Sequence, residues 1–69
     1  MKVRFNEDEY TIMAMFEREG RKQTMQEIYN VSRFLKEDAE MLALVNSTLN
    51  KMRNISDQDF MEMDLTSYQ

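Results

Sequence analysis

The chain contains no proline and a single glycine, Gly20, among its 69 residues. The turns of β-proteins draw heavily on both residue types, and helix interiors exclude both, so this sequence favours helix. The hydrophobic fraction of 42% and the charged fraction of 32% suit amphipathic helices. We therefore expect an all-α fold, a compact three-helix bundle with a short fourth C-terminal helix.

A chain of this length makes at most a single domain, residues 1–69, and buries only about 60% of the surface that its unfolded form exposes. Cysteine and histidine are absent, which excludes disulfides and the usual zinc sites as sources of stability. Neither a metal nor a cofactor is expected. Stability then has to come from regular helix packing, from self-association or from a partner.

The first helix is predicted over residues 7–19. Asn6 is a preferred N-cap residue, and Glu9 stands three positions later, where it completes a capping box. Gly20 follows the apolar run and is expected to take the left-handed conformation that ends the helix. Arg18 would then lie in the last turn, where a cation complements the helix dipole.

The second helix is predicted over residues 22–35, beginning either directly after Gly20 or at Thr24, which could form another capping box. Its apolar residues recur at helical spacing, with Phe34 at the edge of the stripe. The stripe consists of Met25, Ile28, Val31 and Leu35.

The third helix is predicted over residues 39–53, with Asp38 as its N-cap. It has the clearest period of the chain, and the centre of the core is expected along one row of its side chains. The row consists of Met41, Val45 and Met52, together with Leu49.

The fourth helix is predicted over residues 57–64, because Ser56 and Asp59 form a capping box. Residues 66–69 are expected to be a loose tail. Apolar residues flank the caps of the first and fourth helices at the positions of hydrophobic staples, Phe5 with Tyr10 and Ile55 with Phe60.

A basic stripe with one aromatic residue runs along the second helix, opposite its apolar face. Its members follow one another at spacings of four, three and four, which places them on one side of the helix. With two neighbouring arginines they are the candidate partner-binding residues, Arg18, Arg21, Lys22, Gln26, Tyr29 and Arg33. The ordinary interpretation, solvent-exposed residues of an amphipathic helix, stays open.

Catalytic residues are not predicted, because the sequence offers no histidine for proton transfer and no cysteine nucleophile. No stretch is apolar enough for a membrane span or a signal peptide, so the cytoplasm is the expected compartment.

The net charge is −4. The excess lies in the last sixteen residues, as Asp57, Asp59, Glu62 and Asp64 without any cation.

The order of these segments resembles a known family. The chain opens with Phe-Asn-Glu-Asp-Glu at 5–9, continues with Leu-Ala-Leu-Val-Asn-Ser-Thr-Leu-Asn-Lys-Met at 42–52 and closes with Ile-Ser-Asp-Gln-Asp-Phe-Met-Glu-Met-Asp-Leu at 55–65. This is similar to the transposon-transfer assisting protein family, small proteins carried by clostridial conjugative transposons. The resemblance implies a role in transfer of the element, and it implies no catalytic residues.

The expected function is therefore that of a non-catalytic interaction protein, which assists conjugative transposon transfer through contacts with a protein of unknown identity. A homo-oligomer stays open as another partner. The alternative function is an accessory DNA-binding protein that uses the basic stripe of residues 22–35. Nucleic acid is the less favoured partner, because a net-acidic chain has no general attraction to a polyanion.

Overall fold

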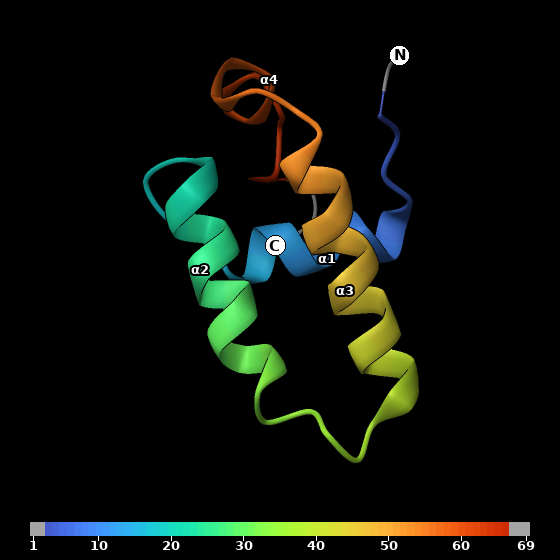
Figure 1. Ribbon diagram of the computed structural model, residues 1–69. Coiled ribbons are helices and arrows are strands. Elements are labelled where there is room, and N and C mark those ends of the chain that lie inside the picture. The colour runs from blue at the N-terminus through green and yellow to red at the C-terminus, as the bar shows by residue number, and fades with distance from the viewer. Residues whose placement is uncertain (1–2, 67–69) are drawn as a thin grey trace.

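A computed structural model of the protein describes residues 3–66. Within that range the chain forms helices and no strand, which confirms the all-α fold. The helices are α1 (Glu7–Met15), α2 (Arg21–Ser32), α3 (Ala39–Arg53) and α4 (Asp57–Met61). In Figure 1, α2 and α3 run in opposite directions and are joined by the lower loop, α1 crosses behind both, and α4 covers the opposite end.

The core lies where all four helices meet. Its buried apolar side chains come from each helix in turn and from the segment after α4. They are Ile12, Met13, Ala14, Ile28, Val45, Leu49, Met52, Phe60 and Leu65. Because α1 contacts both α2 and α3, the continuous apolar run of α1 has two neighbours to pack on.

Helix α1 begins as predicted and ends earlier than predicted. The capping box is present, since the Glu9 N–H donates to Asn6 Oδ1 and the Asn6 N–H donates to Glu9 Oε1, both at 2.8 Å. The rings of Phe5 and Tyr10 lie 5.6 Å apart, as a staple requires. The predicted end at residue 19 is wrong, because the helix stops at Met15.

Gly20 does not end α1 as predicted, because it lies at the start of α2. Gly20 has φ 107° and is the N-cap of α2, so it is no C-terminal residue of α1, and Arg18 lies in the linker. The buried Thr24 hydroxyl fixes this linker: it accepts from the Arg18 N–H at 2.9 Å and donates to the Gly20 carbonyl at 2.9 Å. Of the two predicted starts of α2, the one directly after Gly20 is correct, and the helix ends at Ser32, before the predicted 35.

Helix α3 has the predicted bounds, and Asp38 caps it by accepting from the Met41 N–H at 3.1 Å. Val45, Leu49 and Met52 are buried, as expected for the centre of the core. Met41 is 37% exposed, so its predicted place in the core is wrong. Met41 lies in the first turn of α3 and is not among the apolar residues that pack against the core.

Helix α4 starts with the predicted capping box of Ser56 and Asp59, and it ends at Met61 instead of residue 64. The chain turns there because Leu65 is buried. A continued helix would place residue 65 about 140° around from Phe60. The turn brings both side chains into the core. Of the tail predicted for 66–69, residues 67–69 lie outside the described part.

A buried carboxylate joins α1 to α3. Glu9 is 1% exposed, and its two oxygens receive hydrogen bonds from Lys51 Nζ at 2.7 Å, from Ser47 Oγ at 2.6 Å and from the Asn6 N–H. Burial raises the pKa of Glu9, but the bonds from Lys51, Ser47 and Asn6 and the charge of Lys51 outweigh burial, so the pKa lies below its ordinary value of 4.5. The cap residue predicted from the sequence is therefore also the main polar contact between two helices.

Two methionines of α3 test the position of the core. Met52→Ala is expected to lower the free energy of unfolding by about 2 to 5 kcal/mol, because Met52 is fully buried and its removal leaves a cavity. Met41→Ala, the same change at a partly exposed position of the same helix, is expected to cost less than about 1 kcal/mol. Urea denaturation of both variants measures the difference, and similar costs would contradict the core described here.

The Glu9 network predicts a pH dependence. Because the pKa of Glu9 is lowered on folding, its stabilising effect is complete above the ordinary value of 4.5 and is lost as the pH falls through the lower, folded value. Glu9→Gln should therefore cost about 1 to 3 kcal/mol near neutral pH, and the difference from wild type should shrink at acid pH. Glu7→Gln, at an exposed position in the same turn, is the control. A Glu9→Gln deficit that does not change with pH would refute the network.

Candidate functional site

An open groove with a volume of about 230 Å³ lies between α2 and α3. Four residues of α2 and two of α3 line it. They are Lys22, Met25, Gln26 and Tyr29 from α2, and Leu49 and Arg53 from α3.

Helical spacing explains why these residues meet. The four residues of α2 follow the pattern i, i+3, i+4 and i+7, and the two of α3 are four apart, so each set occupies one side of its helix. The basic stripe of α2 was expected opposite its apolar stripe, but the two border each other at Met25, which is half-buried.

The groove has an apolar floor and a cationic rim. Leu49 is buried and Met25 is half-buried, whereas Tyr29 is 53% exposed. Lys22 and Arg53 are exposed, and the groove lining contains no carboxylate. The Gln26 side-chain amide donates to Asn30 at 3.0 Å, so part of its hydrogen-bonding capacity is used within α2.

The two rim cations differ in their relation to the helix dipoles. Lys22 lies in the first turn of α2, which contains no acidic residue, and there the dipole disfavours a cation by about 0.3 to 1 kcal/mol. Arg53 lies in the last turn of α3, where the dipole favours a cation. Within residues 3–66 neither has a carboxylate within ion-pair distance. Lys22 is thus a charge that the fold itself does not stabilise.

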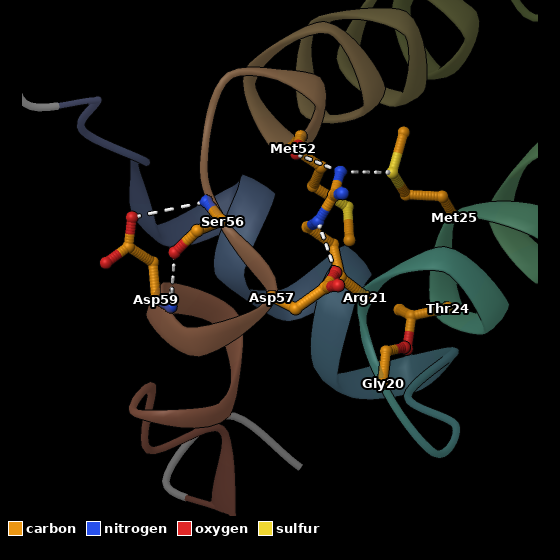
Figure 2. A network of polar contacts seen from close by, with 8 residues as sticks. All are labelled: Gly20, Arg21, Thr24, Met25, Met52, Ser56, Asp57 and Asp59. Carbon is orange, nitrogen blue, oxygen red and sulfur yellow. Dashed lines mark hydrogen bonds and ion pairs between the residues drawn. The ribbon is translucent and has the colours of Figure 1, made fainter.

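Arg21, next to Lys22 in the sequence, points into the structure (Figure 2). Its Nε donates to Asp57 Oδ1 at 2.9 Å, and its Nη1 donates to the Met52 carbonyl at 3.0 Å and to Met25 Sδ at 3.5 Å. The start of α2 is thereby held against the last turn of α3 and the first residue of α4. Arg21 is therefore a structural residue of the groove's end, with only 16% of its side chain exposed.

The candidate partner-binding residues thus separate in the structure. Lys22, Gln26 and Tyr29 come together at the groove, while Arg21 faces inward. Arg18 lies in the linker before α2, where its guanidinium contacts Glu27 at 3.4 Å and the Glu17 carbonyl at 2.9 Å. Arg33, the C-cap residue of α2, is exposed and does not line the groove.

Two contributors from α3, Leu49 and Arg53, were not among the residues predicted from the sequence. Leu49 was assigned to the core, which is also correct, since it is buried and its edge forms the groove floor. A signal existed: a short connection between two helices usually makes them antiparallel neighbours, so the last turns of α3 could have been placed beside the start of α2.

Other large apolar side chains are exposed away from the groove. Phe34, expected at the edge of the apolar stripe of the second helix, lies beyond the end of α2 and is 87% exposed. Met15 and Met61 are 61% and 74% exposed.

No helix within residues 3–66 is long and apolar enough to cross a membrane. The same part of the chain contains no group of three or more acidic side chains arranged to hold a metal ion.

The comparison with known proteins bears on the process in which the chain takes part. Residues 5–67 match the family model described as "putative transposon-transfer assisting protein". No curated protein and no solved structure gives a match. The matched range runs from Phe5 of the first staple to just beyond the buried Leu65, so it contains all four helices and the groove between α2 and α3. The resemblance seen in the sequence is therefore confirmed, and the chain belongs to the transposon-transfer assisting protein family.

Proposed function

We propose that this chain is a cytoplasmic, non-catalytic protein that assists the transfer of a conjugative transposon by binding a protein partner in the groove between α2 and α3. The family description supports the process, transposon transfer. The residues that line the groove support the mode of action, which is binding.

The observation that carries this proposal is the composition of the groove. An exposed tyrosine beside a flexible methionine and a buried leucine offers aromatic and aliphatic contact area, and cations border it. Tyrosine, methionine and arginine are enriched in protein interfaces, and tyrosine and arginine are frequent among the residues whose truncation costs most affinity. Tyr29 and Arg53 are the residues of these types at the groove surface.

The binding role is also supported by what the acidic groups do. Glu9 is the buried carboxylate of the described part, and its hydrogen-bond donors hold it as a link between α1 and α3. Asp57 is engaged by Arg21, and Asp59 accepts from the Ser56 N–H as part of the α4 cap. These carboxylates act in the fold, which leaves no reason to assign them acid–base chemistry.

DNA binding through the basic stripe is the alternative to a protein partner. Of the four cations expected near the stripe, Arg18 and Arg21 contact Glu27 and Asp57, which leaves Lys22 and Arg33. Arg53 of α3 joins Lys22 at the groove. A duplex is held mainly by cations on phosphates, and an apolar groove floor contributes little to such binding. A protein partner uses both the floor and the rim.

The proposal predicts that transfer depends on Tyr29. In a mating assay, a donor whose copy of the gene is deleted in frame should transfer the transposon less often, and the wild-type gene supplied in trans should restore transfer. Tyr29→Ala should restore it at least about tenfold less well, because truncating a central interface aromatic costs about 2 kcal/mol or more.

Phe34→Ala is the matched control, since Phe34 is an exposed aromatic residue outside the groove and its removal should leave complementation intact. Complementation by Tyr29→Ala at the wild-type level would contradict the proposal. Saturable binding of duplex or single-stranded DNA at low salt, abolished by Lys22→Glu with Arg33→Glu, would assign the surface to nucleic acid instead.

A further inference from the structure

We infer that the groove between α2 and α3 receives an acidic amphipathic helix of the partner protein, whose aliphatic side chains pack on Met25 and Leu49 while its carboxylates meet Lys22 and Arg53. This inference rests on the proposed function and specifies the chemistry of the partner.

The distribution of charge is the first argument. The chain carries a net charge of −4. Within residues 3–66, three other depressions have carboxylates among their lining residues. One beside α4 has Asp59 and Glu62, and one beside the start of α3 has Asp38 and Glu40 among its lining residues. The groove between α2 and α3 instead has two cations and no carboxylate. An acidic partner is therefore attracted to this groove and repelled by these neighbouring surfaces.

The position of Lys22 is the second argument. A cation in the first turn of a helix is opposed by the helix dipole, and Arg21 in the same turn adds a like charge. Asp57 compensates Arg21 directly, at 2.9 Å, whereas Lys22 has no carboxylate within ion-pair distance in the described part. Lys22 also borders a depression with Glu19 and Asp57, but Asp57 is already engaged there. A carboxylate from the partner would relieve this unfavourable charge.

The apolar floor is the third argument, and it selects an amphipathic segment over a purely acidic one. Met25, Leu49 and the ring of Tyr29 offer their apolar surfaces side by side. Methionine adapts its shape to an incoming side chain, and an amphipathic helix presents aliphatic anchors at i, i+3 and i+4 to such a groove. Polar side chains on the flanks of that helix then reach the cationic rim.

A second copy of this chain is the principal rival occupant, because its own C-terminal segment is acidic and Met61 is 74% exposed. The helix of that segment, α4, has only five residues, so it cannot present anchors at i, i+3, i+4 and i+7 to the groove. Asp57 is paired with Arg21, Asp59 belongs to the α4 cap, and Phe60 is buried in its own core. The partner is therefore a different protein.

The probe for the test is a 12-residue peptide, acetylated and amidated, with leucine at i, i+3, i+4 and i+7 and glutamate on its flanks. The control peptide has lysine in place of every glutamate and the same leucine face. Both are titrated into the ¹⁵N-labelled protein while the backbone amide shifts are followed. The glutamate peptide should shift the amides of the groove residues in a saturable way, with an affinity at least about tenfold higher than that of the lysine peptide.

Charge reversal gives the decisive comparison. Lys22→Glu with Arg53→Glu should reverse the preference between the two peptides. Lys22→Glu alone should weaken binding of the glutamate peptide. This variant should remain folded, because the dipole favours a carboxylate in the first turn of α2. Arg4→Glu with Lys36→Glu changes the net charge equally at exposed positions outside the groove and should keep the wild-type preference.

Equal binding of both peptides, or shifts centred elsewhere on the protein, would overturn the inference. The inference would also be overturned if the amide shifts of the groove changed with the protein concentration alone, which would indicate a second copy of the chain. Displacement of the glutamate peptide by duplex DNA would overturn it as well. If the peptide result is negative while Tyr29→Ala still impairs transfer, the acidic partner is wrong and the proposed function stands. If the glutamate peptide binds in the groove while Tyr29→Ala transfers the transposon normally, the groove does receive an acidic helix and the proposed function is wrong.

Discussion

The guanidinium group of Arg21 holds together the three helix ends on which the groove depends. It belongs to the first residue of α2 and bonds to the Met52 carbonyl in the last turn of α3 and to the Asp57 carboxylate at the start of α4. These are the positions where helices leave backbone groups and dipole charges uncompensated. One side chain thus stabilises the C-terminus of α3 with its hydrogen bond and connects it to the start of α2 (Figure 2).

The same arrangement separates two adjacent cations into two roles. Arg21 turns inward, and its charge is compensated by Asp57. Lys22, one residue later, lines the groove, and its charge has no such partner within residues 3–66. The Glu9 carboxylate, bonded to Ser47 and Lys51, secures α1 to α3. A chain this short can bury only a small apolar surface, and both polar links add stability between helices that the core alone does not supply. What remains unpaired at the surface is therefore informative about a partner.

Much of the fold follows from local signals in the sequence, because capping is a short-range property. Asn6, Asp38 and Ser56 each mark a helix start that the structure contains. The ends of α1, α2 and α4 were not read correctly in the same way. The inward turn of Arg21 could not be read either, since it depends on contacts with Met52 and Asp57, which are distant in the sequence. Gly20 was misassigned although its contacts are local: its positive φ serves the entry into α2, and its carbonyl accepts from the Thr24 hydroxyl, which in turn accepts from the Arg18 N–H. Only the α2 wall of the groove could be predicted from the sequence, as one face of that helix. The other wall comes from α3.

The most direct test of this account compares the stabilities of two alanine variants at neighbouring positions. Arg21→Ala should lower the free energy of unfolding by about 1 to 3 kcal/mol, since it removes charged hydrogen bonds that are only partly exposed to solvent. Lys22→Ala should leave the free energy of unfolding unchanged or raise it by up to about 0.5 kcal/mol, because a cation leaves the first turn of α2. Equal losses in the two variants, or a loss in Lys22→Ala alone, measured by urea denaturation at low ionic strength, would contradict the division of roles on which the groove is built.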